Sequence, residues 1–92
     1  MRKKNRLELL NLIDDVMSDT EGTSLIPVLE AFRTKIIAGY DNGALLDKMY
    51  YNIQHISLKD RNVNSDRIYD LLQFIDKSNV WHDLGKHLVK SR

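Results

Sequence analysis

The chain has 92 residues, of which 42% are hydrophobic and 29% charged, and it contains no cysteine. This length suits one domain with a single core, the composition is too apolar for a disordered protein, and the lack of cysteine excludes a disulfide framework and a thiolate nucleophile. The net charge of +1 is unevenly spread: residues 1–6 carry +4 and residues 77–92 carry +3, which leaves −6 for residues 7–76.

The first predicted element is an amphipathic helix over residues 7–17. Its acids Asp14 and Asp15 are adjacent, so on a helix they point about 100° apart and cannot share a carboxylate site. We expect both to face solvent. The segment "SDTEGTS", which contains Gly22, is predicted to end this helix. Apolar residues recur at three- and four-residue steps, and neighbouring positions widen the stripe: Leu7, Leu10, Ile13 and Met17, with Leu9, Leu12 and Val16.

A second helix is predicted to follow. Thr23 or Ser24 can cap its start, and Pro27 falls in the first turn, where its missing N–H costs nothing. Gly39 supplies a C-terminal stop. The apolar positions fit a period of 3.6 residues: Leu25, Val28, Leu29, Phe32 and Ile36.

The segment "YDNGA" separates the second helix from a third, and Asp41 and Asn42 are both competent caps for it. An Asn-Gly pair can also form a hairpin turn, but the flanking residues do not alternate as strands would. The apolar positions continue with helical spacing: Leu45, Leu46, Met49, Tyr50, Ile53 and Ile56.

A fourth helix is predicted after the polar run "LKDRNVNSD". Asn64 can cap it, and Val63 is placed to pack on Ile68 as a hydrophobic staple. Its stripe consists of Ile68, Leu71, Leu72 and Ile75. Four amphipathic helices with short connections predict an all-α, antiparallel up-down four-helix bundle over residues 1–76, followed by a basic C-terminal tail or short extra helix over 77–92.

Neither an active site nor a metal site is predicted. His55 lies with Lys48 and Lys59 on the polar side of the third helix, which indicates a surface histidine. His82 and His87 are five residues apart, whereas two ligands on one helical face need three or four. We therefore expect a protein without enzymatic activity, cofactor or metal.

The C-terminal tail is the predicted partner-binding segment. It combines Trp81, a residue type favoured at binding hot spots and bilayer interfaces, with several cations. Gly85 weakens any helix there by about 1 kcal/mol relative to alanine. Trp81 packing back onto the bundle is an alternative, and both roles can hold together. The predicted contact residues are Trp81, His82, Leu84, Lys86, His87, Leu88, Lys90 and Arg92.

Residues 5–76 resemble a known family. The segments "LELLNLIDDVMSD", "LLDKMYYNI" and "IYDLLQFI", with a leucine-rich second helix ending in a lysine and a glycine, are similar to the immunity proteins of pediocin-like (class IIa) bacteriocins, especially the enterocin A immunity group. The resemblance implies a small cytosolic four-helix bundle that protects a bacteriocin-producing cell. It also implies binding to the bacteriocin-bound mannose phosphotransferase permease, with the C-terminal half deciding which bacteriocin is resisted.

The compartment is predicted from residue usage. A chain without cysteine fits a reducing compartment, and Glu8, Asn11 and Asp14 interrupt the first apolar run before a signal-peptide core could form. No segment approaches the roughly 18 uncharged residues of a membrane span. We expect a cytoplasmic protein with peripheral contact at the inner membrane face.

Two other functions stay open. One is a small helical regulatory module that binds nucleic acid or acts as an antitoxin-like partner. The acidic body argues against nucleic acid, because phosphate contacts supply most of the affinity of such binders. The other is a structural homodimer with an interface rich in Tyr40, Tyr50 and Tyr51, whereas the bundle by itself is expected to be a monomer.

Overall fold

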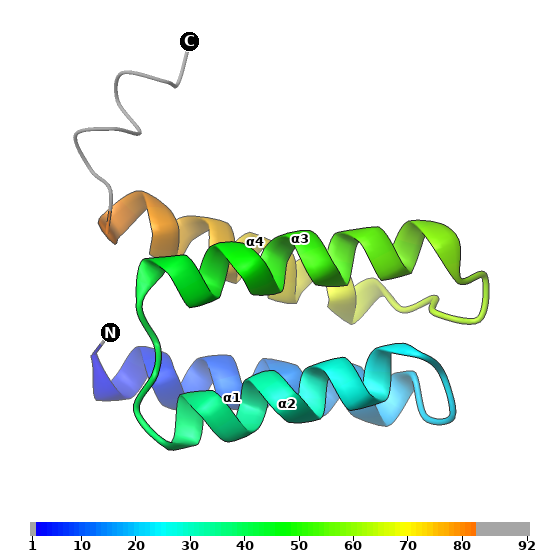
Figure 1. The fold of residues 1–92 in the computed structure, drawn as a ribbon, viewed down its shortest axis with the longest axis horizontal. Coiled ribbons are helices and arrows are strands. Elements are labelled where there is room, and N and C mark those ends of the chain that lie inside the picture. Colours follow the sequence, from blue (N-terminus) through cyan, green and yellow to red (C-terminus); the bar gives the residue numbers. More distant parts are fainter. Residues whose placement is uncertain (1, 83–92) are drawn as a thin grey trace, which may run out of the picture.

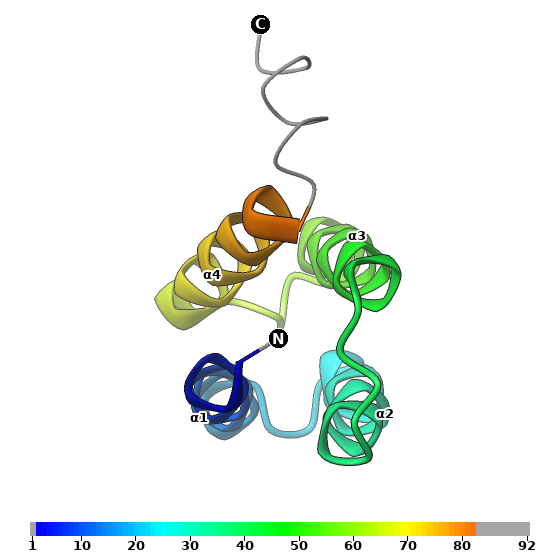
Figure 2. The same ribbon diagram turned by 90° about the vertical axis from the view of Figure 1, so that its left-hand side faces the viewer.

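The computed structural model describes residues 2–82, with side chains as far as residue 76. It contains helices α1 (Lys3–Asp19), α2 (Leu25–Ile37), α3 (Gly43–Lys59) and α4 (Asp66–His82). The helices run alternately in opposite directions (Figure 1) and occupy the corners of a square when viewed end-on (Figure 2). Each helix packs against the next, and α4 closes the ring against α1. The predicted all-α four-helix architecture is confirmed for the described part of the chain.

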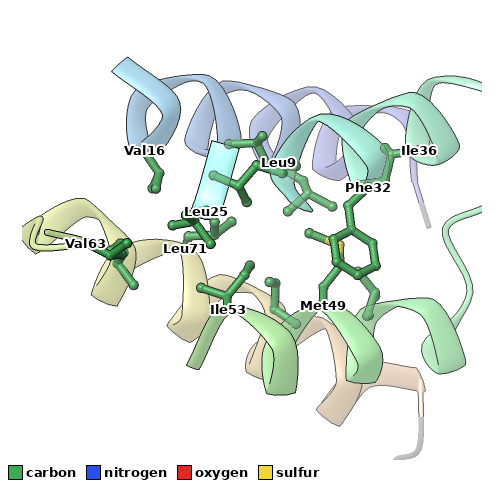
Figure 3. Packing of buried hydrophobic residues seen from close by; sticks show 14 residues of the cluster. Leu9, Val16, Leu25, Phe32, Ile36, Met49, Ile53, Val63 and Leu71 are labelled. Atoms are coloured by element: carbon green, nitrogen blue, oxygen red, sulfur yellow. The ribbon is translucent and has the colours of Figure 1, made fainter. Parts of the chain in front are cut away.

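The core lies on the axis of the bundle (Figure 3). Burying a leucine or isoleucine side chain contributes roughly 1.5–3 kcal/mol, so a core shared by all four helices can offset the entropy of ordering a short chain. Leu7, which the sequence pattern placed in the stripe of the first helix, is instead 55% exposed. The buried line of α1 runs through Leu9, Ile13 and Val16. The core cluster consists of Leu9, Ile13, Val16, Leu25, Leu29, Phe32, Ile36, Leu46, Met49, Ile53, Val63, Ile68, Leu71 and Ile75.

The end of α2 has the geometry that the sequence predicts. Gly39 has φ +100°, a left-handed conformation that glycine adopts at little cost. Its N–H donates to the Ile36 carbonyl at 3.0 Å, and the Tyr40 N–H donates to the Lys35 carbonyl at 2.9 Å. This pair of hydrogen bonds is a Schellman motif, which satisfies carbonyls that the end of a helix would otherwise leave open.

The caps of α2 and α3 agree with the sequence. Thr23 Oγ1 accepts the Leu25 N–H at 3.3 Å at the start of α2, although Ser24, the residue before the helix, makes no side-chain cap. Asn42 Oδ1 accepts the Leu45 N–H at 2.9 Å and so caps α3. Both predicted positions therefore supply an acceptor to an N–H that the first turn leaves unpaired.

The predicted cap of α4 is wrong by one residue. Ser65, and not Asn64, precedes the helix, and its Oγ accepts the Arg67 N–H at 3.1 Å. Asn64 and Ser65 are both good caps in isolation. Ser65 is also tied to α1, because its hydroxyl donates to Asp19 Oδ2 at 2.7 Å. Val63 and Ile68 are both buried in the core, but with Ser65 as the cap they no longer occupy the two positions of a hydrophobic staple.

The adjacent acids of α1 face solvent as expected, with side chains 48% and 50% exposed, and each is also paired with an arginine of a neighbouring helix. Asp14 accepts two hydrogen bonds from Arg33 of α2, from Nε at 2.7 Å and Nη2 at 3.3 Å, and this contact raises the pKa of Arg33. Asp15 lies 3.5 Å from Nη1 of Arg67 in α4. The two carboxylates therefore diverge, as helical geometry requires, and each reaches a different neighbouring helix.

Helix α4 is longer than the sequence pattern indicated. It continues to His82, so the expected boundary between a bundle at 1–76 and a tail at 77–92 falls inside a helix. The apolar stripe stops at Ile75, but the polar residues that follow it do not end the helix. Residues 83–92 of the predicted tail lie outside the described part of the structure.

Candidate functional site

One end of the bundle gathers segments that are distant in sequence. The up-down topology brings the starts of α1 and α3 together with the ends of α2 and α4, as the end-on view shows (Figure 2). An ion pair fixes this arrangement, because Arg6 Nε in α1 donates to Oδ2 of Asp41 in the α2–α3 loop at 2.9 Å. The Asp41 side chain is only 11% exposed and that of Arg6 35%. This ion pair holds the first turn of α1 against the loop.

The same end of the bundle is positively charged. Among the described side chains, residues 2–76, it carries four anions, Glu8, Asp41, Asp47 and Asp76, against six cations, a balance of +2. The opposite end carries seven anions and three cations, a balance of −4, with the Asp14–Arg33 pair between the two ends cancelling itself. We call the positive end the basic end; its described cations are Arg2, Lys3, Lys4, Arg6, Lys35 and Lys48.

Large apolar side chains are exposed at the basic end as well. Leu7 is 55% exposed, Ile37 at the end of α2 is 56% exposed, and Tyr40 in the α2–α3 loop is 64% exposed. A shallow hollow of about 550 Å³ lies on the first turns of α1, lined by Lys3, Lys4, Leu7, Glu8 and Asn11. Cations and exposed apolar side chains therefore occur at the same end of the bundle, and Lys3, Lys4 and Leu7 line one hollow there.

Two of the predicted contact residues lie in the described part of the chain, and the others do not. Trp81 and His82 lie in the last turn of α4, at the same end of the bundle as the starts of α1 and α3 (Figure 1), and their side chains are not among those described. The other predicted contact residues lie outside the described residues: Leu84, Lys86, His87, Leu88, Lys90 and Arg92.

The tyrosines proposed for a homodimer interface come from α3 and from the loop before it. Tyr50 is half-buried against the core, and its ring stands edge-on to that of Tyr51 with centroids 6.0 Å apart. Tyr51 is 69% exposed on the outer face of α3. Tyr40 lies in the loop before α3, at the basic end.

The described residues also include the candidates considered for catalysis, metal binding and membrane insertion. His55 is exposed on α3. Among the described side chains, no group of three or more histidines and acids is arranged to hold a metal ion. No helix in residues 2–82 has the length and apolar content needed to cross a bilayer.

The sequence did not indicate that the basic end extends beyond the termini. Lys35, Lys48 and Tyr40 lie far in sequence from residues 1–6, and only the topology brings them to the same end. The signal was available, because in an up-down bundle the starts of odd helices meet the ends of even ones. If the charges in the first and second half of each helix are counted separately, the sequence predicts one positive and one negative end of the bundle. Counting only the termini against residues 7–76 does not show this.

No family model matches the chain, and no curated protein or solved structure matches it either. The four-helix fold is common to proteins of many functions, so it does not by itself select one.

Proposed function

We propose that the protein is a bacteriocin immunity protein, which protects its cell from a pediocin-like bacteriocin by binding the bacteriocin-bound mannose permease from the cytosolic side. The observation that carries this proposal is the sequence resemblance over residues 5–76. The four-helix bundle found for the described residues is the fold that the resemblance implies.

In this proposal the bundle is a scaffold and the C-terminal segment recognises the partner. The bundle uses fourteen side chains for its core, and helix α4 continues from that core to Trp81 and His82. Tryptophan is a residue type favoured at binding hot spots, because its large ring buries much surface at the cost of few rotatable bonds. The protein would act by occupying a surface of the complex, without turnover.

Expression in a bacteriocin-sensitive strain tests the proposal. Cells carrying the full chain should survive a panel of pediocin-like bacteriocins that kill cells carrying the empty vector. A chain ending at His82 and a full-length Trp81→Ala variant should each lose most of the protection. The truncation is placed after His82 because an earlier end would also remove the last turn of α4.

Matched controls separate recognition from folding. Tyr69→Ala alters another aromatic residue of α4, one that is 66% exposed, and it should protect like the unmodified chain. His82→Ala combined with His87→Ala tests for a metal role: any loss of protection should come from lost partner contact and should not be restored by added zinc, since the proposal needs no metal. Circular dichroism must show that each variant is folded. Killing of cells that express the folded full chain by every bacteriocin would contradict the proposed function, whereas full protection by the folded truncation would move recognition onto the bundle.

A further inference from the structure

We propose that the basic end of the bundle docks end-on against an anionic lipid bilayer. This inference goes beyond protection from a bacteriocin and does not depend on it. It rests on the charge and exposure of residues that the structure describes.

The charge distribution favours one orientation. Among the described side chains, the basic end has a balance of +2 and the opposite end −4. A helix of 17 residues is about 25 Å long, which exceeds two Debye lengths at 0.1 M salt, about 10 Å each. An anionic surface therefore acts mainly on whichever end is close to it, attracting the basic end and repelling the opposite one. Only the basic end gains by approaching.

Five cations of the basic end are exposed: Arg2, Lys3, Lys4, Lys35 and Lys48. Lys3 and Lys4, in the first turn of α1, have no side-chain hydrogen bond or ion pair among the described contacts. Arg6 differs, because its charge is matched by Asp41 at 2.9 Å. Lys3 and Lys4 are therefore available for headgroup contact.

The exposed apolar residues favour a bilayer over a nucleic acid. Tyrosine, leucine and lysine together suit the headgroup region, where a ring or an alkyl chain enters the acyl boundary while the charge stays at the phosphates. Leu7, Ile37 and Tyr40 supply such groups at the basic end, and Leu7 shares a hollow with Lys3 and Lys4. A DNA groove instead receives a helix or a β-ribbon, whereas the basic end presents helix termini and a loop.

Vesicle co-sedimentation of the full chain tests the proposal. The protein should bind vesicles rich in phosphatidylglycerol and show little binding to vesicles of phosphatidylcholine alone. In Lys3→Glu/Lys4→Glu, loss of two cations near the surface should weaken partition into the anionic vesicles about 25-fold or more, since each contributes about fivefold. Acidic residues in a first helical turn are favourable for the helix, so this variant should fold.

A charge-matched control gives the test its specificity. Lys59→Glu/Arg61→Glu changes the net charge equally at the opposite end, where both residues are exposed, and should weaken partition less than about threefold because of screening. Tyr40→Ser should weaken partition several-fold, whereas Tyr69→Ser, at a similarly exposed tyrosine near the start of α4, should not.

Three results would overturn the proposal. The first is equal binding to neutral and anionic vesicles. The second is an equal loss from the two charge reversals, which would mean that only net charge matters. The third is tighter binding, through Lys3 and Lys4, to a DNA duplex at the same phosphate concentration, which would make the basic end a nucleic-acid surface.

Discussion

Arg6 and Asp41 are 35 residues apart in the chain, and Arg6 Nε donates to Asp41 Oδ2 at 2.9 Å in a partly buried contact. The pair connects the first turn of α1 to the loop between α2 and α3. Helix α1 otherwise packs against α2 and α4. This contact therefore sets where the N-terminal cations lie relative to the α2–α3 loop, and so the shape of the basic end.

A double-mutant cycle should measure this contact. With Arg6→Ala and Asp41→Ala, we expect a coupling free energy of about 1 kcal/mol in urea unfolding, because the Asp41 carboxylate is largely shielded from water. The matched cycle uses Asp14→Ala and Arg33→Ala, whose side chains are 48% and 37% exposed. That coupling should be below about 0.5 kcal/mol and should decrease more with added salt. A larger coupling for the exposed pair would show that burial does not control these interactions.

Substitution of Gly39 should destabilise the bundle through backbone conformation alone. No atom lies within 4 Å of the position that a Cβ would occupy, yet φ is +100°. Gly39→Ala should therefore cost about 1 kcal/mol in the free energy of unfolding. Gly43→Ala is the control, because Gly43 is the first residue of α3, where alanine is compatible and should leave stability unchanged or slightly increased. A neutral Gly39→Ala would refute the conformational argument.

Two leucine-to-alanine substitutions should separate the core from the surface. Leu71 is fully buried and Leu58 is 81% exposed. Leu71→Ala should lower the free energy of unfolding by about 2–5 kcal/mol, since a cavity forms among the four helices. Leu58→Ala should change it by less than about 0.5 kcal/mol. If chemical denaturation showed a similar loss of unfolding free energy for both variants, the Leu58 side chain would have to be buried in solution.

The Ser24–Asp60 hydrogen bond should contribute to the acid sensitivity of the fold. Asp60 Oδ2 accepts the Ser24 hydroxyl at 2.7 Å, and Oδ1 accepts the Asn62 N–H at 2.9 Å. These contacts, that of Ser24 first, lower the pKa of Asp60. Because the folded-state pKa lies below the unfolded-state value, the contribution to stability is present above the unfolded-state pKa and is lost as pH falls through the folded-state pKa.

Ser24→Ala should therefore raise the folded-state pKa of Asp60, as observed by NMR titration of its carboxyl carbon. The variant should be less stable than the unmodified chain well above the ordinary aspartate pKa of about 3.9, and the difference should shrink well below it. Ser57→Ala is the control, because the Ser57 hydroxyl donates to the Ile53 carbonyl and not to Asp60. An unchanged Asp60 titration in Ser24→Ala would contradict the assignment.

Local patterns predicted much of the fold. The four helices follow from apolar spacing, and the caps at Asn42 and Gly39 follow from the chemistry of those side chains. The cap at Asn64 was one residue off because Asn64 and Ser65 have similar intrinsic preference. Only the hydrogen bond from Ser65 to Asp19, 46 residues away, distinguishes them, and no local pattern contains it.

Contacts between distant residues account for the other differences. The pairing of Asp14 and Asp15 was not predicted because their partners, Arg33 and Arg67, belong to other helices. The end of α4 could not be located from an apolar stripe that stops at Ile75. At the candidate site, Trp81 was identified by residue type, whereas the basic end required the order and direction of all four helices.

The proposed function depends most directly on contact with the bacteriocin-bound permease. Affinity purification of the full, tagged chain from sensitive cells, with and without a pediocin-like bacteriocin, measures that contact, and Trp81→Ala serves as the matched variant. We expect the mannose permease to co-purify with the full chain only after bacteriocin treatment, and to be strongly reduced with Trp81→Ala. Protection of the cells without any co-purification of the permease, or equal co-purification with and without bacteriocin, would contradict the account.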